Sequence, residues 1–503
     1  MRIMFINFNL GSTPGINNGL AILSSILKNG GHETGAIFLS EEMGYDFDLR
    51  RIEKDITVFR PDVIGFSFME PQFKYAQALA RDVRRYYDGM LICGGPHPTM
   101  DPEGALSADG VDVVCVGEGE DAMLELVERM SRGEECTDIR NLWFKRGRGE
   151  PIKNRLRPFK DISFLPPEDK EIFDLKTLLP LKNYQLEVSV GRGCAYKCSY
   201  CINDTYLGRY KELCDGRIGA KDYIRLKNAD TTIAEIRNVV RKHPEVRKIS
   251  FIDDNLLSYP GFAEGFFRKY KDEIGLPFMC NANPLSFNSK TARLLKDAGC
   301  DDVRFGLESG SERVKRDVMN RPMSNKRVSE AFRYARDGGL MTSSFNMIGL
   351  PTETAEEVMD TMRLNADIAP DTVKVMTFYP FKNTPIYELC REGGLIDHGR
   401  KDALDNYDTS TCLKFSAPHR LFLEKVQVAF NWYINSLLDT DAAPFYKKAV
   451  DEIDGMDRAV WRKFDFDEAD KELSEKMKKR NFQHYVKFCN RSLAVKSTSK
   501  HLR

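Results

Sequence analysis

The chain has 503 residues, and its 75 lysines and arginines are balanced by 75 aspartates and glutamates. This length accommodates several domains of roughly 100 to 200 residues each, and the neutral net charge argues against a nucleic-acid partner or an anionic membrane surface. A hydrophobic content of 42% with 30% charged residues is typical of a globular chain and excludes intrinsic disorder as the main state.

We expect a cytoplasmic protein without a transmembrane segment. No stretch of about 18 consecutive apolar residues occurs, and residues 1–15 lack the cleavage-site pattern of a secretory signal. The 12 cysteines show no disulfide-framework spacing, which favours a reducing compartment and a metal or redox use for some of them.

The first part of the chain, residues 1–135, alternates between strand-like and helix-like patterns. Short β-rich runs occur at residues 1–8, 32–39, 61–68, 90–95 and 111–119, and each gap has room for one helix. This alternation predicts a doubly wound, Rossmann-like parallel α/β domain. In such sheets ligands bind beyond the carboxyl ends of the strands.

Residues 136–184 lose this periodicity and are rich in turn signals, so we interpret them as a linker. A second alternating series fills residues 185–395, with strand-like runs at 185–190, 247–253, 277–283, 302–309, 342–350 and 372–379. Six β/α units predict a full or partial parallel barrel of the TIM type, with its active site at the carboxyl ends of the strands.

Residues 396–503 carry no strand signal. Apolar residues at helical spacing over 420–438 and 468–493 predict a C-terminal helical domain. Its aromatic residues Trp432, Tyr433, Trp461 and Phe482 either close over a substrate or pack in a core. We expect the tail, 496–503, to be frayed.

Three cysteines, Cys194, Cys198 and Cys201, follow the first strand of the second series, in GRGCAYKCSYC. The flanking glycines and interspersed polar residues favour a loop; the alternative is three thiols on one face of a buried helix. Three thiolates without a fourth nearby suit a 4Fe-4S cluster with one open iron. A zinc site completed by Cys214 is the other alternative.

The triplet, with Tyr200 before its last cysteine, resembles the radical S-adenosylmethionine (SAM) superfamily. Further similar segments are FIDDN (251–255), AGCDDVRFGLESGSERV (298–314), NMIGLPTET (346–354) and FYPFKNTPIYE (378–388). The resemblance implies that Cys194, Cys198 and Cys201 bind the 4Fe-4S cluster. It also implies that SAM contacts Tyr200 at its adenine, Asp253 or Asp254 at its methionine amino group, Glu308 at its ribose or methionine, and the segment from Asn346 through Gly349 to Pro351 near its adenine. The alternatives are that Gly349 only makes a turn and that Glu308 only forms a salt bridge.

The first domain resembles the cobalamin-binding subgroup of that superfamily in GFSFMEPQFKYAQALARDVRR (65–85), GGPHPTMDPEGAL (94–106) and VDVVCVGEGEDAMLELV (111–127). The residues implied at the cobalamin are Met69, Glu70, Gly94, Gly95, His97, Pro98, Thr99, Gly117, Glu118, Gly119 and Glu120. Glycines at strand ends let backbone amides approach a large planar cofactor; the alternative is that they only form tight turns.

The D-x-H-x-x-G motif, whose histidine ligates cobalt, does not occur in this sequence. We therefore expect cobalamin without a histidine ligand, its lower face covered by residues 68–72, and His97 in a loop beside the corrin. A solvated His97 with no role is the alternative.

The resemblance implies a cobalamin-dependent radical SAM enzyme, most simply a C-methyltransferase. One SAM methylates the cobalamin, and a second yields a 5'-deoxyadenosyl radical that activates an unactivated carbon of the substrate. Radical cyclisation, rearrangement or oxidation without methyl transfer is one alternative, and a non-catalytic iron-sulfur or cobalamin sensor is another. The expected partners are a low-potential electron donor such as flavodoxin or ferredoxin and a substrate that is a peptide, another natural product, a tetrapyrrole or a lipid.

A second cluster, as in methylthiotransferases, would need other cysteines. Cys93, Cys115 and Cys136 are the candidates, but Cys93 and Cys115 fall inside predicted strands, where their side chains should be packed. The pattern therefore argues against a second cluster. No catalytic side chain is identified by sequence.

Overall fold

The computed structural model describes residues 1–147, 149–254, 256–406, 410–488 and 490–499. Contacts within the chain divide it into two compact units. The first unit holds residues 1–254, 268–277 and 381–388, and the second holds residues 255–267, 278–380 and 389–503. Within the described ranges, no helix combines the length and the apolar character needed to cross a bilayer.

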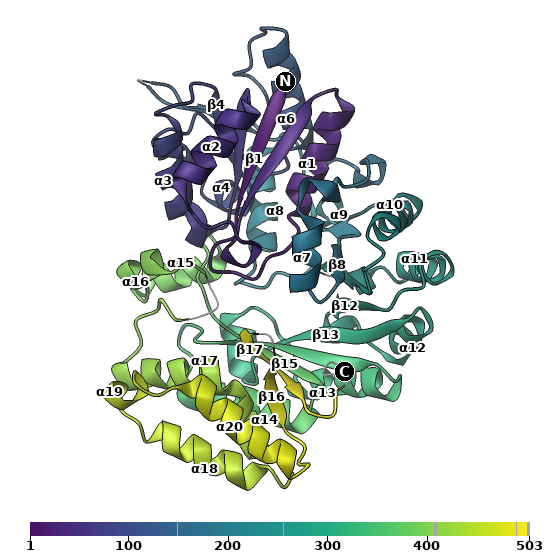
Figure 1. The fold of residues 1–503 in the computed structure, drawn as a ribbon, viewed down its shortest axis with the longest axis vertical. Helices are drawn as coiled ribbons and strands as arrows, with labels where there is room; N and C mark the ends of the chain where they lie inside the picture. Colours follow the sequence, from purple (N-terminus) through teal and green to yellow (C-terminus); the bar gives the residue numbers. More distant parts are fainter. Residues whose placement is uncertain (148, 255, 407–409, 489, 500–503) are drawn as a thin grey trace. The chain divides into compact units, whose positions relative to one another are not determined.

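The first unit begins with a seven-stranded sheet (Figure 1). Five strands run parallel in the order β2-β1-β3-β4-β5, and the antiparallel strands β6 and β7 extend the sheet beyond β5. The parallel strands are β1 (Arg2–Phe8), β2 (Glu33–Leu39), β3 (Val63–Ser67), β4 (Met90–Gly94) and β5 (Val113–Cys115). The order reverses between β1 and β3, and ligands bind at such switch points in open parallel sheets.

Helices cover both faces of this sheet, as a doubly wound fold requires. The helices α1 (Asn18–Asn29) and α6 (Glu120–Ser131) pack together, and so do α2 (Leu49–Phe59) and α3 (Phe73–Val83) on the opposite face (Figure 1). Strand β3 is buried along its whole length, as expected for a central strand covered on both sides. Two short helices, α4 (Pro96–Met100) and α5 (Pro102–Ser107), follow β4. The predicted doubly wound α/β fold is confirmed.

The segment expected to be a linker, residues 136–184, carries two more strands of this sheet. They are β6 (Leu142–Phe144) and β7 (Ile152–Lys153), and α7 (Leu175–Leu181) follows. Trp143 of β6 is buried in the core of the first unit. The sequence pattern missed these strands because two or three residues are too few to show an alternation.

The second β/α series begins within the first unit. Strand β8 (Gln185–Val188) pairs in parallel with β11 (Lys248–Phe251), and a short antiparallel ribbon joins β9 (Gly191–Arg192) to β10 (Arg225–Leu226). The helices here are α8 (Ile202–Leu213), α9 (Ala220–Tyr223) and α10 (Ala229–Lys242). After β11 comes α11 (Pro260–Glu273), whose residues 260–267 are assigned to the second unit and 268–273 to the first. The cysteine loop lies between β9 and α8.

The second unit continues the series with four parallel strands. They are β12 (Phe278–Ala282), β13 (Cys300–Glu308), β14 (Met341–Ile348) and β15 (Thr372–Thr377). The helices between them are α12 (Ser289–Asp297), α13 (Asn325–Asp337) and α14 (Ala355–Ile368). All six strands predicted for the second series are therefore present.

The last hundred residues are not wholly helical, which corrects the sequence prediction. The helices α17 (Ala417–Leu437), α18 (Ala443–Asp454) and α20 (Phe466–Lys479) form as expected, but the helix predicted over 468–493 ends at Lys479. Strands β16 (Tyr485–Phe488) and β17 (Asn490–Lys496) follow, and β17 pairs antiparallel with β15. We predicted a frayed tail at residues 496–503. Lys496 is instead the last residue of β17, and residues 500–503 lie outside the described part.

The aromatic residues of this region pack in a core. Trp432 and Tyr433 are buried on α17, and Trp461 and Phe482 pack against the same apolar cluster. Of the two roles considered for them, the structure therefore supports packing.

Candidate cofactor pocket and cysteine loop

A cavity of about 430 Å³ lies within the first unit, at the carboxyl ends of its parallel strands. Its volume is within the range of small-molecule and cofactor sites. The lining comes from the ends of β3, β4 and β5, from the start of α1, and from the ribbon and helix that flank the cysteine loop. These residues include Asn17, Gly65, Ser67, Gly94, Gly95, Pro96, Cys115, Gly117, Glu118, Gly119, Glu120, Glu168, Ser189, Gly191, Arg192, Gly193, Asn203, Tyr206, Tyr223, Arg225, Lys227 and Asp254.

Glycines form much of the wall. Gly95 has a φ of 94°, and a Cβ atom there would lie 2.9 Å from Ser67 Oγ. Gly117 has a φ of 84°, and its Cβ would lie 2.5 Å from Tyr210 Oη. Backbone conformations of this kind strain other residues, so both positions require glycine for the turn and for the close approach. These glycines leave backbone atoms without side chains on the wall of the cavity, where a cofactor can approach them closely.

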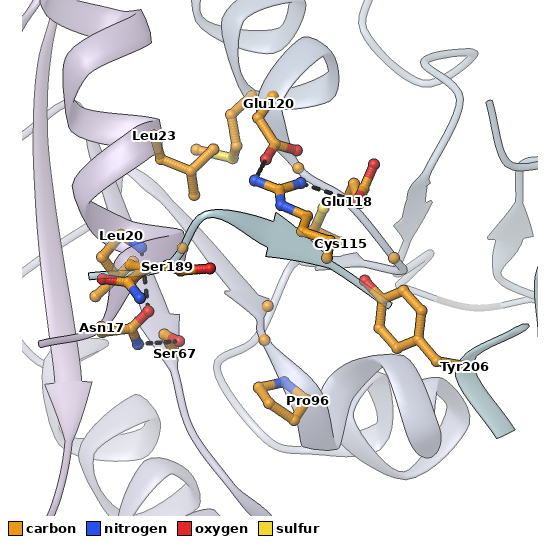
Figure 2. Close-up of a pocket in the computed structure, with 18 of the residues that line it drawn as sticks. Asn17, Leu20, Leu23, Ser67, Pro96, Cys115, Glu118, Glu120, Ser189 and Tyr206 are labelled. Carbon is orange, nitrogen blue, oxygen red and sulfur yellow. Dashed lines mark hydrogen bonds and ion pairs between the residues drawn. The ribbon is translucent and has the colours of Figure 1, made fainter. Parts of the chain in front are cut away.

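Asn17, which lines the pocket, is the centre of a hydrogen-bond network at the start of α1. The Asn17 side chain accepts a hydrogen bond from Leu20 N, 3.1 Å away, and so caps α1. Its Nδ2 donates to Asn7 Oδ1 (2.7 Å) and to Ser67 Oγ (3.1 Å; Figure 2). This network ties the ends of β1 and β3 to the start of α1 at the switch point.

Two glutamates and two arginines form a buried ion cluster on the wall. Arg192 Nη1 donates to Glu118 Oε1 at 2.8 Å, and its other terminal nitrogen binds Glu120. Arg225 holds Glu118 bidentately, at 2.8 and 2.6 Å. Glu118 and Glu120 lie side by side at the top of the pocket view (Figure 2). The four charges cancel, which is what allows them to be buried together.

The pKa values in this cluster follow from the pairing. Burial alone would raise the pKa of Glu118, but the hydrogen bonds and charges of Arg225 and Arg192 outweigh it and hold that pKa below its usual range. Burial alone would lower the pKa of Arg192, but Glu120 and Glu118 raise it instead. Glu118 and Arg192 are therefore charged over the physiological pH range.

A second balanced cluster lies beside the first and includes two residues of the pocket wall. Glu168 Oε2 accepts from the fully buried Lys170 (2.6 Å), and its other oxygen binds Lys227. Glu235 completes the cluster, 3.4 Å from Lys170 Nζ. Lys227 follows β10 and Arg192 is in β9, so ion pairs hold both strands of the ribbon.

Aromatic rings form the wall next to α8. The Tyr206 and Tyr210 rings stack at 5.6 Å, and Phe159 stacks on Tyr210 at 3.8 Å. Tyr206 lines the cavity (Figure 2). Burial raises the pKa of both phenols well above the ordinary value, so they stay neutral.

The cysteine triplet lies on the loop that we predicted, and the helical alternative is wrong. Cys201 is the N-cap residue of α8, and its backbone N–H donates to Cys198 O at 3.1 Å. Cys201 Sγ accepts from Asn203 Nδ2 at 3.4 Å. Among the described residues, no group of three or more Cys, His, Asp or Glu side chains is already gathered for a metal ion. The donor set itself, three thiols on one loop, fits a 4Fe-4S cluster that draws them together. Cys214 lies at the far end of α8 from this loop.

Of the two aspartates predicted near SAM, only Asp254 lines the pocket, where it accepts a hydrogen bond from Asn203 Nδ2 at 2.8 Å. Asp253 is buried and accepts from Val190 N (2.9 Å) and Gly191 N (2.5 Å). Burial raises the pKa of Asp253 to about 7 despite these hydrogen bonds. Asp253 therefore fixes the strand end before the cysteine loop. Tyr200 lies half-buried in the turn before Cys201.

The other SAM candidates lie in the second unit, at the ends of β13 and β14. Glu308 ends β13 with a φ of 66°, a backbone conformation that is strained for a non-glycine residue and concentrates at functional sites. Asn346 is buried, and its amide binds Ser344 Oγ (3.1 Å), Lys374 O (3.0 Å) and Asn365 Nδ2 (2.7 Å). Its side chain is thus engaged on the α14 side of the sheet. Gly349 has a φ of 76° and forms the turn after β14.

The predicted cobalamin residues divide into two groups. Gly94, Gly95 and the segment Gly117 to Glu120 line the pocket, whereas Met69, Glu70, His97, Pro98 and Thr99 lie outside its lining. Thr99 Oγ1 accepts a hydrogen bond from Gly117 N at 3.0 Å and so stabilises the loop after β5. Glu70 accepts from Lys382 N at 2.8 Å.

His97 is neither solvated nor in a loop, which corrects both expectations for it. It lies in α4 with 4% of its surface exposed, and its ring packs 4.7 Å from the Phe73 ring and 5.8 Å from the Phe68 ring. Phe68 belongs to the same apolar core. Residues 68–72, expected beneath the corrin, do not line the cavity.

Sequence reasoning missed the charged part of the site. Arg192 and Arg225 were not candidates, although Arg192 stands two residues before Cys194. Their partner Glu118 is 74 and 107 residues away in sequence, so no local pattern could pair them. Cys93 and Cys115 are buried in β4 and β5, as predicted.

Comparison with known families fits this geometry. The B12 binding domain family matches residues 12–127, and the radical SAM superfamily matches residues 188–364. The chain therefore combines a B12-binding domain with a radical SAM domain. The predicted cofactor set of SAM, a 4Fe-4S cluster and cobalamin is the set that these two domains use.

Two curated relatives align with most of this chain. An uncharacterized methyltransferase, PH0819 of Pyrococcus horikoshii, is 25% identical over 396 residues, which cover 76% of this chain and 80% of the relative. The anaerobic magnesium-protoporphyrin IX monomethyl ester cyclase of Rubrivivax gelatinosus is 24% identical over 416 residues, covering 78% and 70%. A solved structure of the cobalamin-dependent SAM radical enzyme OxsB, with aqua-cobalamin and SAM bound, shares the fold at a TM-score of 0.67 and 14% identity, covering 95% of this chain and 75% of that one.

Proposed function

We propose that this protein is a cobalamin-dependent radical SAM methyltransferase that methylates an unactivated carbon. One observation carries the proposal: the glycine-walled pocket at the strand ends of the B12-binding domain also takes in residues from both sides of the cysteine loop. Gly193 precedes Cys194, and Asn203 and Tyr206 follow Cys201. A cobalamin held in this pocket would therefore lie next to the cluster loop.

Each cofactor has candidate residues. Cys194, Cys198 and Cys201 would hold the cluster, and Gly94, Gly95 and the segment Gly117 to Glu120 would surround the cobalamin. When bound, the cofactors supply a methyl group, a low-potential electron and a hydrogen-abstracting 5'-deoxyadenosyl radical. The protein orients them and excludes water.

Several residues are proposed for contacts with SAM. Asp254 is better placed than Asp253 for the methionine amino group, because the Asp253 carboxylate is already bound to backbone N–H groups. Glu308 and the turn from Asn346 to Gly349 are proposed for the ribose and adenine, with Tyr200 against the adenine. Because the Asn346 side chain is engaged elsewhere, we expect the backbone of that turn to make the contact.

The relatives support methyl transfer and also define the rival. PH0819 is named as a methyltransferase, whereas the Rubrivivax protein is named as a cyclase. Radical cyclisation, rearrangement or oxidation without methyl transfer is therefore the second candidate function. The substrate classes expected from the sequence, which are peptides, other natural products, tetrapyrroles and lipids, fit either reaction.

The proposed surroundings follow from the chemistry. A radical SAM enzyme needs an electron donor of low potential, and we propose a flavodoxin or ferredoxin. Cys93, Cys115 and Cys214 form no disulfide, which is typical of a reducing compartment and supports a cytoplasmic location.

By-product analysis separates the two candidate functions. Methyl transfer uses SAM in two ways, so turnover with substrate and reductant should give S-adenosylhomocysteine and 5'-deoxyadenosine together, and label from methyl-deuterated SAM should enter the product. Cyclisation or oxidation consumes no methyl group. Formation of 5'-deoxyadenosine in proportion to an unlabelled product, without S-adenosylhomocysteine, would establish the rival.

A further inference from the structure

The cysteine loop is attached at both of its ends to one short segment of the B12-binding domain. On the N-terminal side, Arg192 lies two residues before Cys194 and hydrogen-bonds to Glu118 and Glu120. On the C-terminal side, α8 begins directly after Cys201, and its Tyr210 Oη accepts a hydrogen bond from the backbone N–H of Glu118 at 2.8 Å. The two elements that flank the loop, β9 and α8, therefore both contact Glu118.

Glu118 is also held too firmly to move alone. Arg225 binds its carboxylate bidentately and faces Arg192 in the β9–β10 ribbon. Gly117 packs so closely on Tyr210 that not even a Cβ atom would fit. The Glu118 side chain is 15% exposed, and charge-assisted hydrogen bonds are strong in such surroundings. A shift of residues 117–120 must therefore shift the ribbon or α8, and with them the cysteine loop.

The same segment lines the cofactor pocket. A ligand in the pocket and a cluster on the loop each require a defined position of residues 117–120. Whichever binds first fixes that position, so the second binds to a segment that is already ordered. Such coupling is reciprocal, because each ligand must change the affinity of the other by the same factor.

We propose that Glu118 is a positioning residue that couples the two cofactor sites, so that cobalamin in the pocket and the iron-sulfur cluster on the cysteine loop bind cooperatively. This inference rests on the proposed function in requiring both cofactors. It adds a defined physical link between them, which neither family match assigns.

The test measures the coupling factor and needs no turnover. The affinity for hydroxocobalamin is determined under anaerobic conditions by spectral titration, once with the cluster reconstituted and once with cluster-free protein. For the wild type we expect binding to be tighter with the cluster, by a factor within the range of about 5 to 150 that is usual for coupled sites. Resistance of the cluster to an iron chelator, with and without cobalamin, should change in the same direction.

Glu118→Gln is the decisive variant. It keeps the shape of the side chain but removes the charge that holds Arg192 and Arg225, and we expect the coupling factor to fall to about one to two. Tyr210→Phe removes only the hydroxyl that binds the Glu118 N–H, and its factor should lie between those of Glu118→Gln and the wild type. This second variant decides the question if Glu118→Gln fails to fold.

Glu125→Gln is the matched control. Glu125 lies on α6 and also accepts hydrogen bonds from two arginines, Arg129 and Arg157, but it does not line the pocket. Its loss removes a comparable ion cluster from the same domain, and the wild-type coupling factor should be retained.

The outcomes are distinct. If folded Glu118→Gln shows the same coupling factor as the wild type, the inference is overturned. If Glu118→Gln does not fold, the same result in Tyr210→Phe overturns it. A factor of one in the wild type, with both cofactors bound, overturns the inference and leaves the proposed function intact. Failure of the wild type to bind any cobalamin overturns both.

Discussion

Two strand-end loops of this protein share a sequence pattern but differ in electrostatics. The loop after β5 and the loop after β14 each contain a glycine with positive φ, Gly117 and Gly349. A glutamate with little exposure lies after each glycine: Glu118 directly follows Gly117, and Glu353 lies four residues after Gly349. Glu118 is bound by two arginines, and its pKa lies below the usual range. Glu353 Oε2 accepts from the backbone N–H groups of Gly349 (2.7 Å) and Leu350 (3.2 Å), and burial raises its pKa to about 8.

The difference shows what a buried carboxylate can do in each setting. Backbone N–H groups of the same turn stabilise the turn only, and they do not offset the cost of burying a charge. Guanidinium groups from distant segments keep the carboxylate ionised and tie those segments together. The first loop is thus a junction between elements, whereas the second is a self-contained turn.

The largest effect expected from this comparison is at Gly117. Gly117→Ala places a Cβ atom against Tyr210 in a left-handed conformation, so it should weaken hydroxocobalamin binding by at least about tenfold and lower the melting temperature. The measurement is spectral titration together with thermal unfolding.

Gly133→Ala is the control for backbone strain alone. Gly133 has a φ of 70°, and in the described part of the chain no atom lies within 4 Å of its added Cβ. It should cost about 1 kcal/mol of stability and leave cobalamin binding unchanged. Equal binding losses in the two variants would contradict the packing role of Gly117.

A smaller effect separates the two glutamates by pH. Because the folded pKa of Glu353 is about 8, against an ordinary value of 4.5, the folded state holds an extra proton between these pH values. The contribution of this group to stability is complete below pH 4.5 and is lost as the pH rises to 8, by up to about 1.4 kcal/mol per pH unit. The glutamine in Glu353→Gln does not titrate. Denaturant unfolding should therefore show that the free energy of unfolding of the variant rises relative to that of the wild type from pH 5 to 8.

Glu357→Gln is the matched control on the neighbouring helix. Hydrogen bonds from Arg313 lower the pKa of Glu357 to about 2, so its contribution is present above pH 4.5 and is lost only as the pH falls through about 2. Between pH 5 and 8 the free energy of unfolding of this variant should change with pH in parallel with that of the wild type. If the Glu353→Gln curve is also parallel, Glu353 is ionised in the folded protein.

The smallest effect is expected at His97, which lies outside the pocket. His97→Leu should change the cobalamin affinity by less than about threefold, and the electron paramagnetic resonance of bound cob(II)alamin should lack splitting from a nitrogen ligand in both proteins. Splitting that is present in the wild type and lost in the variant would make His97 a cobalt ligand.

The sequence predicts elements better than side-chain directions. The strands of both parallel series were predictable because buried strands form apolar runs between turn signals, but β16 and β17 were not, since residues 485–496 also fit a helical spacing. Gly95 and Gly117 were found at strand ends, where glycine has a local reason to occur. Met69 and His97 belong to the same similar segments, but both lie outside the pocket lining, and the His97 ring packs against Phe73 and Phe68. The Glu118–Arg225 pair depends on tertiary contact and leaves no local signal.

The central claim is that one chain holds both a cluster on the cysteine loop and a cobalamin in the strand-end pocket. Its most direct test is cofactor analysis of anaerobically reconstituted protein beside the variant with Cys194, Cys198 and Cys201 changed to Ala. The wild type should hold about four irons, four sulfides and one base-off cobalamin per chain, and the triple variant should lose the iron and sulfide. A full cluster in the triple variant, or a wild type with an intact cluster that binds no cobalamin, would contradict the account.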